Sequence, residues 1–297
     1  MKVIGLENDY YLSGNNIWIE VSGFTRLSSA LEVVIKRLET QTSYSFNITP
    51  NADNTYLFNI SEAIRGLLPS PNHIDINTLQ SFEITFKAFF NTGAETETIT
   101  LTKNFIRGWR RKEGVKEWHL NEGESLVIGK WIEWGNLPIV QPKKIIGGRL
   151  VTFTPSKDEV ERINIRGCKY KIIKFLNSLG GYQCYVFENS EEKTKTKGKK
   201  TISKIETSLR QNNFFNLGIE ADKTIELHTK TKRHLQPIIT DLVQSYDVYL
   251  FDPDGVSDES QWHRLVLESN DSVENTYDNS FENKISFSFY DDVAREL

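Results

Sequence analysis

The chain has 297 residues, of which 38% are hydrophobic, 11% aromatic and 26% charged, and this ordinary globular composition suggests about two domains. A net charge of −4 excludes a global electrostatic drive toward nucleic acid or anionic membranes. No apolar run approaches the ~20 residues needed to cross a bilayer, and the N-terminus lacks the apolar core of a signal peptide. We therefore expect synthesis in the cytoplasm and no membrane contact.

The first hundred residues alternate polar and apolar side chains, as half-buried strands do. Segments with this pattern, separated by Asn, Gly, Ser and Pro, cover residues 17–21, 31–38, 44–48, 82–89 and 96–101. Such spacing is typical of an antiparallel β-sandwich. The pattern predicts an N-terminal domain over residues 1–107, a β-sandwich of immunoglobulin or fibronectin type.

One short helix is expected to interrupt these strands. Ser61 is in place to act as its N-cap, and Pro69 would end it. Ile64, Leu67 and Leu68 then fall on one apolar face. We expect this helix to close one end of the sandwich.

A tryptophan-rich connector follows over residues 108–135. It holds four of the six tryptophans, Trp109, Trp118, Trp131 and Trp134, with Arg110 beside the first of them. Tryptophan and arginine are favoured anchors in protein interfaces. We predict that these five side chains either pack the two domains together or contact a partner.

The C-terminal domain, residues 136–297, is also expected to be β-rich. Its predicted strands cover residues 148–153, 161–165, 169–173, 183–187, 223–228, 247–251, 262–267 and 284–289. Between them, residues 234–246 place Leu235, Ile238, Ile239 and Leu242 in one stripe, which predicts a longer helix with Pro237 in its first turn. The chain is thus expected to be mainly β, with two sandwich-like domains and one helix in each.

The segment EEKTKTKGKK, residues 191–200, is the sharpest electrostatic feature. Its low apolar content favours a solvated hairpin loop whose deletion would leave the fold intact and impair assembly. Lys195, Lys197 and Lys199 could alternatively contact phosphate, although no aromatic residue accompanies them for base stacking. A third interpretation is a loop that becomes ordered against an acidic neighbouring subunit.

The sequence contains no motif typical of a catalytic site, a metal site or a cofactor-binding site. Cys168 and Cys184 lie in strand-like segments without a CxxC motif, which favours free buried thiols over a zinc site, with a disulfide between them as the alternative. The acidic run at residues 252–259 fits a hairpin turn better than a calcium loop, because the residue at position 12 is His263. A carboxylate pair for glycoside hydrolysis remains open, since nothing marks one.

The segment FLNSLGGYQCYVFE, residues 175–188, contains adjacent glycines between an apolar run and an aromatic strand. Gly180 and Gly181 permit positive φ and close backbone approach, so this stretch predicts a structural corner. The same segment resembles a motif of tail and neck structural proteins from tailed phages infecting Bacteroidetes, including crAss-like phages. The likeness is strongest over residues 170–270 and also includes residues 58–64.

This resemblance implies a virion protein and carries no catalytic residue with it. We expect a homo-oligomeric ring in the phage tail or head-to-tail connection, in contact with neighbouring tail or portal-proximal proteins. The tryptophan-rich connector and the lysine segment would supply contacts, and the lysines would reach a neighbour or the DNA channel. The alternative is a carbohydrate-binding or host-recognition module that presents exposed tryptophans to a glycan.

Overall fold

The computed structural model describes residues 1–70, 79–90, 96–109, 120–134, 137–163, 170–202, 214–252 and 261–289. Among these, side chains are described at all strand positions except 134, 137, 138, 195–202 and 214–222. The chain forms two compact units that interleave in sequence. The first contains residues 1–131, 140–160 and 177–182, and the second contains residues 132–139, 161–176 and 183–297. These units differ in extent from the predicted domains.

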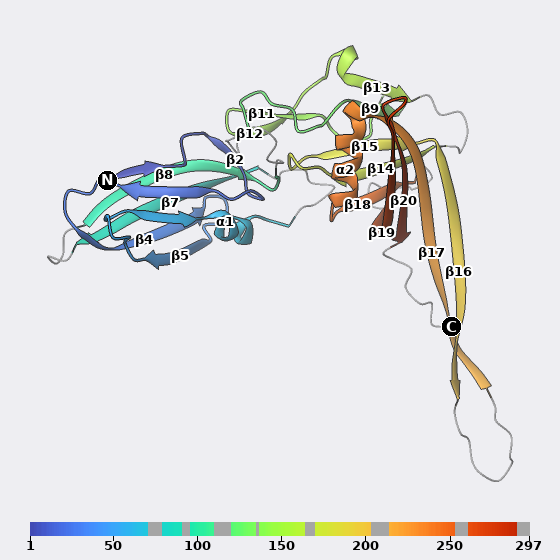
Figure 1. The fold of residues 1–297 in the computed structure, drawn as a ribbon, viewed down its shortest axis with the longest axis horizontal. Helices are drawn as coiled ribbons and strands as arrows, with labels where there is room; N and C mark the ends of the chain where they lie inside the picture. The colour runs from blue at the N-terminus through green and yellow to red at the C-terminus, as the bar shows by residue number, and fades with distance from the viewer. Residues whose placement is uncertain are drawn as a thin grey trace, which may run out of the picture. The chain divides into compact units, whose positions relative to one another are not determined.

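The first unit is a β-sandwich (Figure 1). Its three-stranded sheet has the order β1 (Lys2–Ile4), β3 (Trp18–Ser22) and β6 (Tyr56–Asn59). Its five-stranded sheet has the order β2 (Tyr10–Leu12), β8 (Thr96–Ile106), β7 (Leu79–Phe90), β4 (Ser28–Arg37) and β5 (Ser43–Ile48). Alternate residues of both sheets, such as Val21, Val33, Phe58 and Phe86, form one buried core. Sandwiches bury their inner faces in this way.

Two details of this unit depart from the expected pattern. β2 pairs with β8 in parallel, so the sheet is not wholly antiparallel. Helix α1 (Ser61–Leu67) forms and buries Ile64, but Ile60 takes the N-cap position and Ser61 is the first helical residue. The Ser61 hydroxyl instead donates to the carbonyl oxygen of Asn15, 2.5 Å away, so its predicted capping role is wrong.

Shorter elements follow in the middle of the chain. One sheet has the order β10 (Leu137–Pro138), β9 (Trp131–Trp134) and β13 (Val160–Ile163). A two-stranded ribbon joins β11 (Lys143–Ile146) to β12 (Arg149–Thr152). The 3-10 helix η1 (Lys157–Glu159) precedes β13 and begins with a capping box between Ser156 and Glu159.

The second unit is built on one seven-stranded sheet. Its order is β15 (Tyr182–Phe187), β14 (Lys171–Leu176), β18 (Val248–Phe251), β19 (Trp262–Asn275), β20 (Ser280–Phe289), β17 (Phe214–Lys232) and β16 (Asn189–Ile202). β14 is buried over nearly its whole length, which explains its run of apolar residues. Helix α2 (Gln236–Gln244) follows the 3-10 helix η2 (Arg233–Leu235) and buries Ile238, Ile239 and Leu242.

The main sequence-based prediction is confirmed: the chain is mainly β, with a short early helix and a longer late one. The apolar stripe at residues 234–246 correctly located α2, with Pro237 in its first turn. Within the described residues, no helix has the length and apolar content needed to span a membrane.

Candidate functional site at the base of a long hairpin

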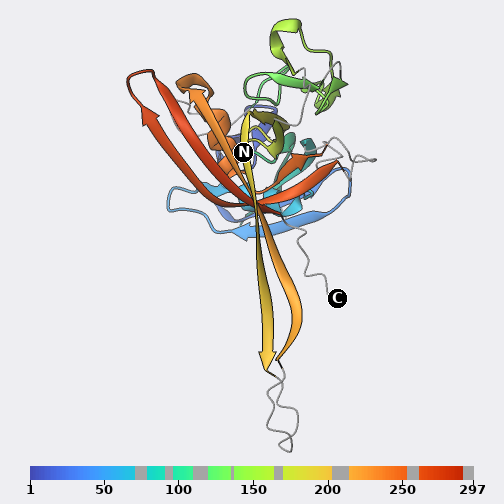
Figure 2. The ribbon, with the colours of Figure 1, turned by 90° about the vertical axis from the view of Figure 1, so that its right-hand side faces the viewer.

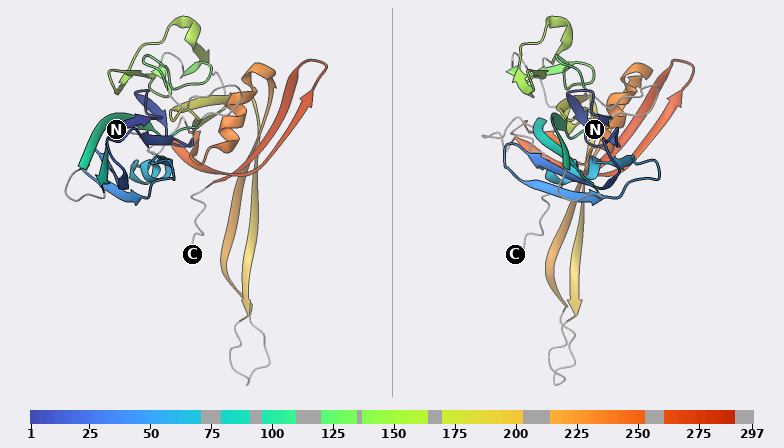
Figure 3. Two further views of the ribbon diagram at one scale, coloured as in Figure 1. Left: turned by 60° about the vertical axis from the view of Figure 1, so that its left-hand side comes forward. Right: turned by 90° about the vertical axis from the view of Figure 1, so that its left-hand side faces the viewer.

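The most distinctive element is the β16–β17 hairpin, which extends beyond the other strands of its sheet. β17 pairs with β20 only from Thr224 to Lys232, whereas its pairing with β16 continues to Phe214. Residues 194–202 and 214–223 therefore form a two-stranded extension, here called the arm, which Figures 2 and 3 show running past the rest of the sheet. A two-stranded hairpin alone is marginally stable in water. The arm thus depends on how its base is held and on what its edges contact.

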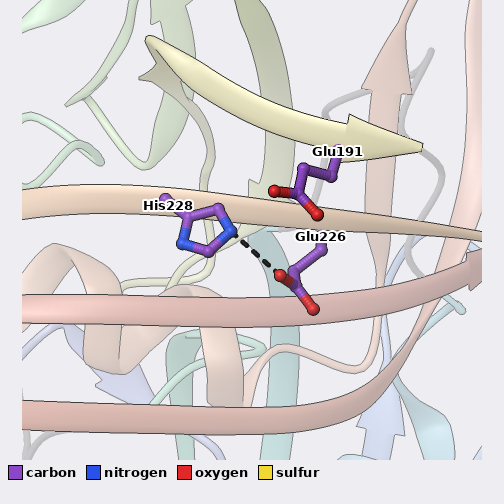
Figure 4. A group of neighbouring side chains, drawn as sticks. All are labelled: Glu191, Glu226 and His228. Carbon is purple, nitrogen blue, oxygen red and sulfur yellow. Dashed lines mark hydrogen bonds and ion pairs between the residues drawn. The ribbon is translucent and has the colours of Figure 1, made fainter. Parts of the chain in front are cut away.

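Three residues with metal-binding side chains gather at the base of the arm (Figure 4). Glu191 on β16 lies directly opposite Glu226 on β17, and His228 follows two positions later on the same face. The imidazole Nε2 of His228 is 3.0 Å from Oε1 of Glu226. One ligand atom from each residue lies within 4.8 Å of the other two.

Two lysines share this cluster. Nζ of Lys193 is 3.4 Å from Oε2 of Glu191 and 3.3 Å from Oε2 of Glu226. Nζ of Lys284, on β20, is 3.0 Å from Oε1 of Glu226. The two carboxylates are therefore matched by two ammonium groups, and Glu226 links three adjacent strands.

The ionisation of Glu226 follows from these contacts. The hydrogen bond from Lys284 is the largest cause that lowers the pKa of this carboxyl, and Lys193 adds a second, so that the pKa falls to about 2. Glu226 is consequently a carboxylate at every pH at which the protein is expected to work. Its charge is used to tie β16 and β20 to β17.

These residues fit an ion-pair network better than a metal centre. Carboxylate oxygens and an imidazole nitrogen would suit zinc or a similar divalent ion. However, the Lys193 amine already lies between both carboxylates, and Lys284 occupies the oxygen of Glu226 that faces His228. A metal would have to displace both lysines, so no ligand role is assigned to Glu191, Glu226 or His228.

The other face of the base is held in the same manner. The side chain of Glu192 points to the opposite face from that of Glu191. Its Oε1 lies 2.6 Å from Nζ of Lys171, and its Oε2 lies 3.6 Å from Nζ of Lys223. The hydrogen bond from Lys171 is the largest cause that lowers the pKa of Glu192. The base of the arm is thus fastened on both faces by charge pairs.

The lysine segment is a strand and not the predicted loop, because residues 191–200 belong to β16. Its first three residues make ion pairs at the base of the arm, so deleting all ten residues would also remove these contacts. In the arm, Lys195 lies opposite Asp222 and Lys197 opposite Glu220, while Lys199 lies opposite Gly218. The low apolar content of residues 191–200 favours a loop, but their partners on β17 lie too far along the chain for the local sequence to indicate a strand.

The tryptophans predicted as partner contacts differ in accessibility. The side chain of Trp131 is only 4% exposed and meets Phe153 edge-on at 6.2 Å between ring centroids, so little of it is left for a partner. Trp109 is half-buried, and its amide donates to the carbonyl oxygen of Ser178. Arg110 and Trp118 lie outside the described residues, and Trp134 is described only as backbone of β9.

The double glycine forms a tight corner within the first unit. Gly180 has φ +81°, and a Cβ there would lie 2.1 Å from the carbonyl oxygen of Arg107. A Cβ on Gly181 would lie 2.4 Å from the carbonyl oxygen of Leu126. Both positions therefore need glycine for close backbone approach, and Gly180 also needs it for its conformation.

Asn177 organises this corner and was not singled out from the sequence. Its buried side-chain oxygen accepts hydrogen bonds from the amides of Leu179 and Gly181, each 3.0 Å long. Its side-chain nitrogen donates to the carbonyl oxygen of Leu126 at 2.7 Å. Asparagine is a common turn former because its side chain bonds nearby backbone in this way, which was the available signal.

Cys184 is a buried free thiol. Burial raises the pKa of this thiol to about 12, so the reactive thiolate does not form at neutral pH. Cys168 and residues 253–259 of the predicted acidic turn lie outside the described residues.

Comparison with known proteins identifies no relative: no family model, no curated protein and no solved structure matches this chain.

Proposed function

We propose that this chain is a non-enzymatic structural protein of a phage virion, assembled as a homo-oligomeric ring in the tail or at the head-to-tail connection. In this proposal it is made in the host cytoplasm and meets neighbouring tail or portal-proximal proteins in the particle. The virion assignment rests on the resemblance of residues 175–188, and the ring rests on a structural feature.

The single observation that carries the proposal is the arm. A strand of 19 residues paired with one of 14 is long for a globular protein, whose strands usually have 3–10 residues. Its base is fastened by ion pairs on both faces, while its backbone edges have no partner among the described strands. An anchored projection with open edges is suited to contact another subunit.

The proposal is tested by peptide mass spectrometry on density-gradient-purified virions, with the copy number measured against the major capsid protein. We expect the chain to co-sediment with particles in multiple copies, in a number that a closed ring can have. Its absence from particles, with the chain in the soluble fraction, would reject the proposal.

A second candidate function, glycan binding, is favoured by Trp18. This ring is 55% exposed on the outer face of the three-stranded sheet. Glu20 lies on the same face, and Asn59 lies directly opposite Trp18 on β6. An exposed aromatic ring beside a carboxylate is a combination that stacks on and hydrogen-bonds a sugar. The amide of Asn59 is already used within the protein, because its oxygen accepts from the amides of Ile17 and Ser61 and its nitrogen donates to Oδ1 of Asn16.

A glycan array separates the two functions. Glycan binding predicts a signal from the wild type that Trp18→Ala abolishes and that Trp18→Phe partly keeps. The arm is not involved, so its removal should leave any such signal unchanged. An array without signal for the wild-type chain removes the second candidate.

A further inference from the structure

We propose that the arm adds strand β17 to the open edge of β5 in a second copy of this chain. Each subunit then gives one arm and receives one, which is a head-to-tail contact. This inference rests on the proposed assembly function and specifies its interface.

The donor edge is the outer side of β17 in the arm. β16 lies along one side of residues 214–223, and no strand of the described chain lies along the other. The first six of these residues, FFNLGI at positions 214–219, carry no charge. The opposite edge of the arm is β16, whose Lys195, Lys197 and Lys199 discourage strand pairing there. The arm therefore has a lysine-bearing edge on β16 and an uncharged edge on β17. One register shift interrupts the β17 edge at Leu217, between the residues opposite Lys199 and Lys200.

The acceptor edge is β5, an end strand of the five-stranded sheet in the first unit. Its six residues, Ser43–Ile48, have the sequence SYSFNI and contain neither charge nor proline. Proteins usually protect such an edge with lysine, proline or a bulge, but the pairing of β5 with β4 is continuous over these residues. Its length matches the uncharged part of the donor edge.

The register shows which backbone groups of β5 face outward. The amide of Arg37 donates to the carbonyl oxygen of Thr42 at 2.8 Å, at the turn end of the β4–β5 pair. Hydrogen-bonded and non-hydrogen-bonded pairs alternate along an antiparallel ladder. The amides of Ser43, Ser45 and Asn47 consequently point away from β4, and the side chains of all three are exposed. This is the template that a sixth strand requires.

The asymmetry of the contact has a structural consequence. The donor strand belongs to the second unit and the acceptor strand to the first, so the two surfaces are different. A heterologous contact of this kind produces a ring when its rotation closes, and a filament when it does not. Neither a second donor nor a second acceptor is needed.

The test uses one variant for each edge. Ser45→Pro removes an outward amide hydrogen without breaking a bond to β4, since proline is tolerated at such edge positions. Its controls are Ser45→Thr, which keeps the amide, and Ala52→Pro, which adds proline in the turn closed by the Asn54 amide and the Asn51 carbonyl. The donor variant replaces residues 195–222 by Asn-Gly, because Thr194 and Lys223 lie directly opposite each other and suit a two-residue turn.

Native mass spectrometry and sedimentation velocity give the readout on the full chains. We expect oligomers for the wild type and both controls, and at least about tenfold weaker association for Ser45→Pro and for the arm-replaced chain. A mixture of these two variants should form a one-to-one heterodimer and nothing larger, because it contains one intact donor and one intact acceptor. Circular dichroism and the melting temperature verify that each variant is folded.

Three outcomes would overturn the inference: a monomeric wild type, unchanged assembly of folded Ser45→Pro, or no heterodimer in the mixture. If replacing the arm abolishes assembly but Ser45→Pro does not, the proposed ring would still be supported, and β5 would be rejected as the acceptor strand. The particle mass spectrometry described above is independent of these variants, so failure of this interface and failure of the virion assignment can be told apart.

Discussion

At the scale of single residues, the corner at residues 177–181 is the most constrained part of the chain. Gly180→Ala introduces a side chain at φ +81°, where a Cβ would be 2.1 Å from the Arg107 carbonyl. Such a conformation costs about 1–3 kcal/mol before the clash is counted. We expect urea denaturation to show that the free energy of unfolding of Gly180→Ala is lower than that of the wild type by at least this amount.

Gly66→Ala is the matched control for that measurement. Gly66 lies in α1, and nothing would lie within 4 Å of the added Cβ. Alanine in place of a helical glycine stabilises by about 0.5–1 kcal/mol. Equal effects of the two substitutions would contradict the assignment of the corner.

The tryptophans provide a second prediction at this scale. Trp131→Ala removes a ring that is 4% exposed and should destabilise the protein by about 3–5 kcal/mol. Trp18→Ala removes a ring that is 55% exposed and should change stability by no more than about 0.5 kcal/mol. Denaturation curves followed by circular dichroism check both, because that signal does not depend on the tryptophan removed.

At the scale of elements, the stability that the base of the arm gives to the fold is expected to depend on pH through the ionisation of Glu226. The folded pKa of about 2 lies below the ordinary value of 4.5, so the ion pairs stabilise the fold fully above pH 4.5 and lose their contribution as the pH falls toward 2. Glu226→Gln should therefore be less stable than the wild type at pH 7. The difference should shrink steadily below pH 4.5.

Thermal melting at several pH values measures this difference. Glu191→Gln serves as the control, because Glu191 is 63% exposed and pairs only with Lys193 among the contacts of this cluster, whereas Glu226 pairs with two lysines. If Glu191→Gln lowered the melting temperature more than Glu226→Gln does, Glu191 and not Glu226 would be the main anchor of the base.

The register of the arm can be checked by exchanging charges. Lys195 lies opposite Asp222, so Lys195→Glu places like charges across the strands and should loosen the arm. Combining it with Asp222→Lys should restore the arm, with a coupling of about 0.2–1 kcal/mol. Amide hydrogen exchange of the arm is the measurement, and a double variant no better protected than the single one would contradict the register.

The sequence was sufficient for elements whose side chains alternate locally. β4 and β7 were located within a few residues because every second side chain along much of each strand is buried. In β5 and in most of β8 the alternation is between exposed and partly buried side chains, and it was sufficient to place them. β16 was missed because its residues are polar on both faces, and only pairing with β17 makes it a strand. The cluster of Glu191, Glu226 and His228 was missed because Glu191 is distant in sequence from the other two residues, and only the pairing of β16 with β17 brings them together.

At the scale of the whole molecule, assembly and nucleic-acid binding differ in their response to salt. The proposed contact consists of backbone hydrogen bonds and uncharged side chains, and the chain carries a net charge of −4. Assembly through it should change by less than about tenfold between 50 mM and 200 mM salt, whereas a protein making 6–10 phosphate contacts loses roughly 10³–10⁵ in affinity over that range.

Sedimentation at these two salt concentrations, with and without duplex DNA, separates the two roles of the arm. Lys195 and Lys197 occupy backbone positions opposite Asp222 and Glu220, and acidic residues at these positions weaken the attraction of the arm for phosphate. We therefore expect salt-tolerant oligomers and weak DNA binding. Steep loss of assembly with salt would instead mean that the lysines themselves make the contact, and would place the interface on the charged face of the arm and not on its uncharged edge.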